Sequence, residues 1–244
     1  MSTDNELIKT FFYKMHDSDF KNIFKMITQS INSCNKNLWL IGGQIRDYYL
    51  NVSSFDIDFA TDCDAELIYN DLAKNNLFTT NLKYYSKFHT LTIKGKNNKF
   101  DIAQLRNEFY KKNSIDPVID FHSSIVNDLQ RRDFTINALA INLNDKHGFE
   151  LIDPYNGLED IKNKVLRALH PNSYINDPKR IFRAARYSTR YNLNISKKEV
   201  SLINLGMNNM HLLTKQQIDK EKQLIEKEEN HIESFALLKD WGYN

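Results

Sequence analysis

Two aspartates, Asp56 and Asp58, stand two residues apart in the segment FDIDF, residues 55–59. Apolar and polar residues alternate here, which predicts a β-strand. Because residues i and i+2 of a strand point to the same face, both carboxylates project together. Two such charges repel each other unless a cation lies between them, and hard carboxylate oxygens suit Mg²⁺. Taken alone, the pattern also fits an ordinary pair of surface acids.

A third carboxylate stands in the segment KFDIA, residues 99–103. Phe100 and Ile102 face one side of this predicted strand, which leaves Asp101 on the other side. We expect an adjacent strand to bring Asp101 beside the first two aspartates. Three acids together would complete a two-metal site, which activates an attacking hydroxyl and neutralises a leaving group.

Two adjacent glycines, Gly42 and Gly43, follow the apolar run 38–41, which predicts a strand that ends in a tight turn. Without a Cβ atom, glycine tolerates positive φ and lets backbone N–H groups approach a phosphate closely. Arg46, one turn into the predicted helix, is placed to reach the same anion. The alternative is a strand-to-helix turn stabilised by a pair between Arg46 and Asp47.

A second polar group stands in the segment DLQRRDFTINA, residues 128–138. We predict a helix from about 128 to 140, in which Asp133 and Asn137, four residues apart, lie one above the other. With Arg132, this acid and amide would hold a ribose hydroxyl and a triphosphate. An ordinary amphipathic helix is the alternative.

The segment NDPKRIFRAARYSTR, residues 176–190, predicts a helix with an arginine-rich face. The arginines that fall within about 120° of one another on this helix are Arg180, Arg183, Arg186 and Arg190. Their charges would repel each other unless an anion or acids face them. Asp177 can cap the helix, and with Arg180 it offers one acceptor and a fork of donors that could read the edge of a nucleobase. An intramolecular salt bridge is the alternative.

Composition sets the class of protein. The chain has 244 residues, 41% of them hydrophobic, with seven Gly and four Pro, which favours a helix-rich α+β body. No apolar run approaches the roughly 20 residues that span a bilayer, and the N-terminus resembles no targeting signal. Cys34 and Cys63 are expected to be reduced thiols, so we predict a cytoplasmic protein without membrane contact.

The net charge is only +2, but residues 161–198 carry ten Lys or Arg and a single acid, Asp177. Such a basic stretch favours a polyanion partner, although a solvated helix face is the alternative.

The order of predicted elements gives an α+β fold in two domains. In the first, residues 1–155, a small mixed or antiparallel sheet is flanked by helices; the second, 156–244, is all-helical. The further predicted elements are helices over 5–33 and 64–74, strands over 88–93 and 149–152, a mobile loop over 107–127, and helices from 158 onward with breaks near Pro171 and Gly206.

These segments, in this order, resemble the class II tRNA nucleotidyltransferases (CCA-adding enzymes) and the related bacterial poly(A) polymerases of the polymerase-β-like superfamily. LIGGQIRDYYL with FDIDFATD is similar to the G-G-x-x-R-D and D-x-D motifs, and DLQRRDFTINALAI to the ribose-binding R-R-D motif. DPYNGLEDIKNKVLR resembles the segment between head and neck, and NDPKRIFRAARY the E-D-x-x-R motif that selects the base. The resemblance covers roughly residues 38–190 and less clearly 213–242.

The resemblance implies a nucleotidyltransferase head (1–155) and a helical neck that begins a truncated body (156–244). It implies transfer of C, A or both from CTP or ATP to the 3′ end of a tRNA or another RNA. Asp56, Asp58 and Asp101 would be the catalytic ligands of two Mg²⁺ ions. The residues expected to contact the nucleotide are Gly42, Gly43, Arg46, Arg132, Asp133, Asn137, Asp177, Arg180, Arg183 and Arg186. Arg106 and Arg190 are expected to contact RNA.

Two departures from the family pattern bear on function. Asn176 stands where the family usually has Glu, which holds the base-selecting arginine in place, so discrimination between C and A could loosen. Family members also continue for a long helical body and tail that grip the tRNA. The expectation is that a partner chain supplies RNA binding, that the basic face of the neck suffices, or that the chain is truncated.

Several activities remain open from sequence. Complete CCA addition, CC-only addition, A-only addition and poly(A) synthesis share these motifs. A hypothesis from another class is an RNA- or nucleotide-binding subunit that has lost independent catalysis and needs a partner.

Overall fold

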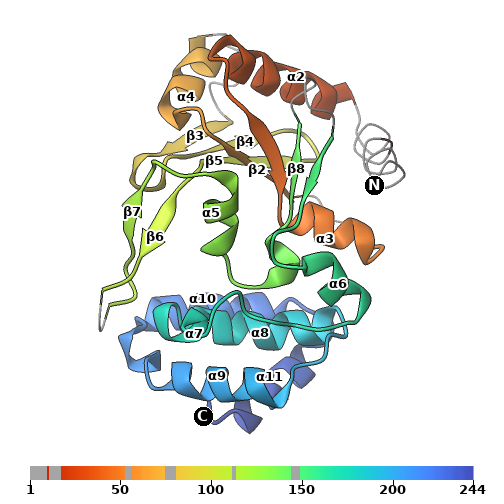
Figure 1. Ribbon diagram of the computed structural model, residues 1–244, viewed down its shortest axis with the longest axis vertical. Helices are drawn as coiled ribbons and strands as arrows, with labels where there is room; N and C mark the ends of the chain where they lie inside the picture. Colours follow the sequence, from red (N-terminus) through yellow and green to blue (C-terminus); the bar gives the residue numbers. More distant parts are fainter. Residues whose placement is uncertain are drawn as a thin grey trace. The chain divides into compact units, whose positions relative to one another are not determined.

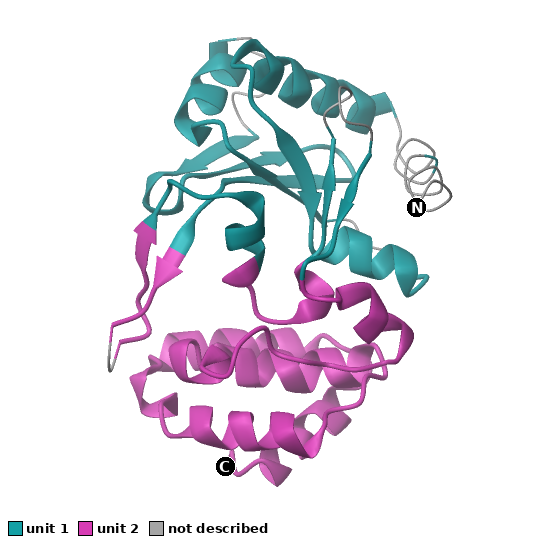
Figure 2. Cartoon of the chain, viewed as in Figure 1, with its two compact units in different colours: residues 1–107, 120–129, 139–154 teal, residues 108–119, 130–138, 155–244 magenta. Residues whose placement is uncertain are grey.

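The computed structural model describes Thr10 and residues 18–52, 56–74, 81–111, 114–143 and 149–243. The chain divides into two compact units (Figure 2). The first contains residues 1–107, 120–129 and 139–154, and the second contains residues 108–119, 130–138 and 155–244.

The first unit is built on a mixed sheet, as the sequence predicted. Within the described residues its strands are β1 (Leu38–Ile41), β2 (Asp56–Thr61), β3 (Leu82–Tyr85), β4 (Thr90–Lys94), β5 (Lys99–Gln104), β8 (Ala140–Asn142) and β9 (Leu151–Ile152). Their order across the sheet is β3-β4-β5-β2-β1-β8-β9 (Figure 1). β2 and β5 run parallel, whereas the other neighbours are antiparallel.

Helices α2 (Ser18–Ser33) and α4 (Ala65–Lys74) pack on one face of this sheet (Figure 1). Phe59 of β2 and Phe100 of β5 are fully buried. The ring centroid of Phe20 in α2 lies 5.2 Å from that of Phe100, and Phe24 lies 5.9 Å from Phe59. Because side chains alternate along a strand, the acidic residues of β2 and β5 project from the opposite face.

The helices predicted over 5–33 and 64–74 are confirmed as α2 and α4 where they are described. Apart from Thr10, the part of the first prediction before residue 18 lies outside the described residues. A short helix, α3 (Gly43–Tyr49), follows β1, and a 3-10 turn, η1 (Ser86–Phe88), precedes β4.

Two sequence predictions were wrong. The predicted loop over 107–127 contains strands β6 (Asn107–Phe109) and β7 (Val118–Asp120), which form a two-stranded sheet, and the start of α5 (Ile125–Gln130). The helix predicted over 128–140 ends at Gln130, and a 3-10 turn, η2 (Thr135–Asn137), follows. Every residue from 133 to 141 is buried, so no exposed face distinguishes a helix from a turn and a strand.

The second unit is dominated by helices. They are α6 (Gly157–Lys162), α7 (Ser173–Asn176), α8 (Lys179–Arg190), α9 (Lys197–Met207), α10 (Lys215–Glu226) and α11 (His231–Asp240), with a 3-10 turn, η3 (Met210–Leu212). α8 packs against α10 and α11. Its apolar side chains Ile181, Phe182 and Ala185 are buried, as the sequence predicted.

Gly206 is the last residue but one of α9, which ends at Met207, so the helix break predicted near Gly206 is confirmed. A Cβ atom at this position would lie 2.4 Å from the Cβ atom of Tyr174 and 2.9 Å from its backbone. The glycine therefore lets α9 approach α7 more closely than any other residue would.

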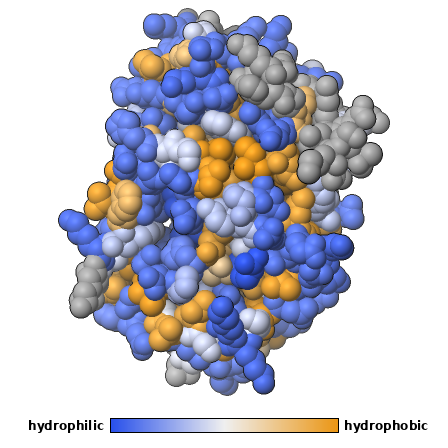
Figure 3. Space-filling view, in the orientation of Figure 1, coloured by the Kyte–Doolittle hydropathy of each residue, from blue (hydrophilic) through white to orange (hydrophobic). Residues whose placement is uncertain are grey.

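Hydrophilic residues cover most of the face seen in Figure 3, with apolar side chains in smaller groups among them. Within the described residues, no helix combines the length and the apolar character that crossing a bilayer requires.

Candidate active site

The carboxylate pair of the first unit lies on two neighbouring strands. Asp58 of β2 and Asp101 of β5 are partners in the parallel register, and Asp56 is opposite Lys99. Partners on adjacent strands point to the same face. The adjacency that the sequence predicted for Asp101 is therefore present in the sheet.

Lys99 already places a positive charge among these acids. Its ammonium donates a hydrogen bond to Asp101, and the hydroxyl of Thr92 donates to Oδ1 of Asp101 at 2.5 Å. Partial burial alone would lower the pKa of Lys99, but the hydrogen bond to Asp101 and the charges of Asp101, Asp56 and Asp58 raise it. The acids thus attract a cation.

A divalent metal fits the chemistry of this donor set. No group of three or more His, Cys, Asp or Glu side chains in the described parts of the chain is already arranged around a metal position. Asp58 and Asp101 are nevertheless hard oxygen donors at one register position, of the kind that Mg²⁺ prefers. The Lys99 side chain is 41% exposed, so it would have room to move away from Asp101 in favour of a metal ion.

Of the two glycines in the turn before α3, only Gly42 has the positive φ that the sequence analysis expected of a glycine turn. Gly42 has φ 68° and ψ −117°, a conformation that residues with a Cβ atom rarely adopt, and its N–H donates to the carbonyl of Leu139 at 3.0 Å. A Cβ atom on Gly43 would meet only the Arg46 side chain, at an ordinary 3.5 Å. The turn therefore requires glycine at position 42.

Arg46 is buried, and its guanidinium contacts Asp47 Oδ1 from Nε at 2.8 Å and from Nη2 at 2.7 Å. This is the Arg–Asp pair that the sequence offered as the alternative to phosphate binding. Arg106, also in the first unit, donates from Nη1 to the carbonyl of Phe88 at 3.3 Å and lies 5.4 Å from the centre of its ring.

Asp133 is the centre of a hydrogen-bond network in the second unit. Its Oδ1 accepts from the Phe134 N–H at 2.8 Å and from Asn137 Nδ2 at 2.9 Å. Its Oδ2 accepts from Arg183 Nε at 2.7 Å, and Arg183 Nη2 lies 2.5 Å from the same oxygen in an ion pair. The predicted contact between Asp133 and Asn137 exists, although a turn and a 3-10 helix make it rather than an α-helix. Half-buried Arg132 precedes them.

This network keeps Asp133 ionised although it is buried. Burial alone would raise the pKa of Asp133, but the charge of Arg183, the hydrogen bond from Asn137 and the charge of Arg180 lower it well below its usual range. The network therefore fixes both the charge and the orientation of the Asp133 carboxylate.

The predicted base-reading pair stands where α8 begins. Asp177 lies just before the helix, and its Oδ1 accepts from the Lys179 N–H at 3.2 Å. Arg180 Nε lies 3.9 Å from Asp177 Oδ2. The rest of the Arg180 guanidinium is bound within the unit: Nη1 donates to Ser173 Oγ at 2.6 Å, and Nη2 donates to the carbonyl of Arg131 at 2.7 Å.

Acids of the same chain face the other arginines of α8. Arg190 contacts Glu228 at 3.2 Å, and Arg183 contacts Asp133. Burial raises the pKa of Glu221 on α10, and the charges of Arg183 and Arg186 partly offset this rise. Ion pairs within the chain, which the sequence offered as the alternative, therefore neutralise part of the arginine-rich face of α8. Sequence reasoning missed Glu221, because nothing near it in the chain points to α8.

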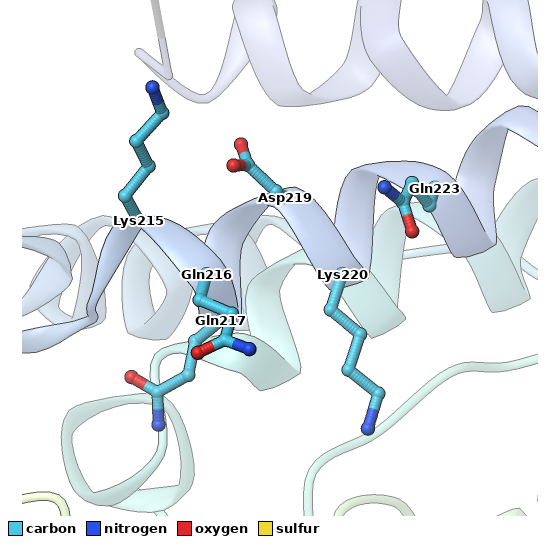
Figure 4. Close-up of a pocket in the computed structure, with 6 residues that line it drawn as sticks. All are labelled: Lys215, Gln216, Gln217, Asp219, Lys220 and Gln223. Atoms are coloured by element: carbon cyan, nitrogen blue, oxygen red, sulfur yellow. The ribbon is translucent and has the colours of Figure 1, made fainter.

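Figure 4 shows a hollow lined by residues of α10 alone, namely Lys215, Gln216, Gln217, Asp219, Lys220 and Gln223. Lys215 and Asp219 point to one side of the helix and Lys220 to the other (Figure 4). None of the predicted site residues lines this hollow.

The chain is similar to known proteins over most of its length. A family model described as the poly A polymerase head domain matches residues 38–167. The A-adding tRNA nucleotidyltransferase of Halalkalibacterium halodurans is 33% identical over 228 residues, which cover 91% of this chain and 53% of that relative. The chain thus spans about half the length of this relative.

Solved structures of CCA-adding enzymes have the same fold. An apo form (form II) matches with a TM-score of 0.84 and 28% identity, covering 97% of this chain and 56% of that chain. The Thermotoga maritima enzyme complexed with tRNA matches with a TM-score of 0.79 and 27% identity, covering 96% of this chain and 54% of that chain. These matches extend over both units.

Proposed function

Because the chain belongs to the family of the poly A polymerase head domain, we propose that it is a nucleotidyltransferase that extends the 3′ end of a tRNA. It would take C, A or both from CTP or ATP. The observation that carries this proposal is the pairing of Asp58 with Asp101 in the parallel register of β2 and β5.

Asp56, Asp58 and Asp101 would hold two Mg²⁺ ions. When bound, such ions make the RNA 3′-hydroxyl a better nucleophile toward the α-phosphate and stabilise the leaving pyrophosphate. Lys99 would leave Asp101 as the metal site fills, and its ammonium would remain near the negative charges.

The other residues of the first unit would hold the triphosphate. Gly42 fixes the turn at the start of α3, and Gly43 and Arg46 follow it. Arg46 would then exchange part of its contact with Asp47 for a phosphate oxygen. Arg106 is the proposed RNA contact of this unit.

In the second unit, Arg132, Asp133 and Asn137 would hold the ribose and phosphates, with Arg183 keeping the Asp133 carboxylate in one orientation. Arg186 would add positive charge for the phosphates. Arg190 is a proposed RNA contact, and an RNA phosphate would have to compete with Glu228 for it.

The base would be read at the start of α8. Cytosine and adenine each present an amino donor, whereas guanine and uracil present a carbonyl acceptor at the corresponding position. The Asp177 carboxylate can accept from the amino group, and Arg180 can donate to the neighbouring ring nitrogen. This pair would therefore select CTP and ATP against GTP and UTP.

A-only addition has specific support, because the A-adding enzyme of H. halodurans matches 91% of the chain. The test uses the purified chain and tRNA transcripts that end before the first C, the second C or the terminal A of the CCA end. CTP and ATP are supplied separately with Mg²⁺, and extension of at least one transcript is expected. Nucleotide binding without any extension would favour the second candidate, a binding subunit that needs a partner.

A further inference from the structure

The guanidinium of Arg180 is fixed before any nucleotide binds. Its side chain is 6% exposed, and its two terminal nitrogens donate to Ser173 Oγ at 2.6 Å and to the carbonyl of Arg131 at 2.7 Å. Contacts at two nitrogens leave a planar group little freedom to rotate. The direction in which Arg180 presents its remaining N–H groups is therefore set by these two acceptors.

Ser173 also links Arg180 to the ribose-binding segment. Its side chain is fully buried, and its hydroxyl lies 3.4 Å from the carbonyl oxygen of Asp133, to which it can donate while it accepts from Arg180. Arg180 is thus connected through one hydroxyl to Asp133.

Position 176 does not perform this task. In the described part of the chain, no hydrogen bond joins the Asn176 side chain to Arg180. Ser173 and Asn176 are the first and last residues of α7, and residues three apart lie on neighbouring parts of a helix surface. An acceptor at 173 can therefore serve the arginine that a carboxylate at 176 would otherwise hold.

We propose that Ser173 is the positioning residue that sets the base selectivity of Arg180. The inference rests on the proposed function, because it assigns a role within the base-reading pair. Without the Ser173 hydroxyl, Arg180 Nη1 loses a charge-assisted hydrogen bond, and the guanidinium can turn. A turned guanidinium would donate less well to the ring nitrogen of cytosine or adenine, and it could also meet the carbonyl of uracil or guanine.

The test compares Ser173→Ala, Ser173→Thr and the wild type in single-nucleotide extension of a truncated tRNA, with kcat/KM measured for each of the four nucleoside triphosphates. For Ser173→Ala, we expect the ratio of kcat/KM for the preferred nucleotide to kcat/KM for UTP or GTP to fall by about ten-fold or more. The reason is the loss of a buried hydrogen bond to a charged group. Ser173→Thr keeps the hydroxyl and should keep most of the ratio. In the double variant S173A/N176E, the new carboxylate should restore the ratio at least in part.

Ser234→Ala is the matched control. Ser234 is also fully buried, and its hydroxyl lies 2.7 Å from Thr189 Oγ, away from the base-reading pair. This variant should leave the ratio unchanged. A Ser173→Ala ratio equal to that of the wild type would overturn the inference, whereas a wild type that extends no tRNA would overturn the proposed function instead.

Discussion

Asp58 and Asp101 occupy one register position on two parallel neighbouring strands, β2 and β5. The residues that flank them, such as Phe59 and Phe100, are buried and contact phenylalanine rings of α2. Strand alternation therefore does two things at once: it anchors both strands in the core and directs both carboxylates to the opposite face. The same two strands therefore carry buried core residues and both acids.

Lys99 should compete with divalent metal. Replacing Lys99 by Met removes the ammonium that now contacts Asp101, so Mg²⁺ should bind more tightly, by roughly five-fold if the two charges interact as near a water-exposed surface. The measurement is a titration of Mn²⁺ or Mg²⁺ followed by the shift in melting temperature, without substrate. Lys21→Met, on exposed α2 surface, is the control. Equal metal affinity in Lys99→Met and wild type would show that Lys99 does not occupy the metal position.

Asp133 should stabilise the second unit in a pH-dependent way. Its pKa is lower in the folded chain than in the unfolded one, so its contribution is full above the ordinary pKa of about 4 and is lost as pH falls through the folded value. Asp133→Asn should lower the free energy of unfolding at pH 7 by about 3 kcal/mol, because Arg183 loses a buried partner. The difference from wild type should shrink in acid, as urea unfolding at several pH values would reveal.

Glu228→Gln provides the comparison for Asp133, since it removes the acid from a more exposed pair with Arg190. This change should lower the free energy of unfolding by less than about 1 kcal/mol. If Asp133→Asn and Glu228→Gln lowered the free energy of unfolding by the same small amount, Asp133 would not be the centre of the network.

Gly206→Ala should destabilise the chain although alanine is the better helix former. The added Cβ would lie 2.4 Å from Tyr174 Cβ, and overpacking of this kind costs about 1–3 kcal/mol. Thermal unfolding measures the effect, with the exposed Ser201→Ala of the same helix as control. A gain in stability for Gly206→Ala would mean that α7 and α9 are not in close contact.

Alternation and helical period predicted the parts of the fold that have one buried and one exposed face. β2, β5 and the buried side of α8 are of this kind. The position of Asp101 on a strand was predicted from the same alternation. The segment from 133 to 141 is buried throughout and carries no such signal, so a turn and a strand were taken for a helix.

Partners that are distant in the chain were beyond sequence reasoning. The period of α8 revealed its arginine face, but whether acids or a bound anion neutralise that face depends on Asp133, Glu221 and Glu228, which arrive from other segments. Ser173 is only seven residues before Arg180, yet a serine that starts a four-residue helix has no distinguishing pattern.

The most direct test of the proposed activity is single-turnover extension of a truncated tRNA by the wild type and by Asp58→Asn, with Mg²⁺ and with ATP or CTP. We expect the wild type to add nucleotide and Asp58→Asn to add none, while both bind the nucleotide and unfold at the same temperature. Undiminished extension by a correctly folded Asp58→Asn would contradict a catalytic role for the carboxylates of β2 and β5.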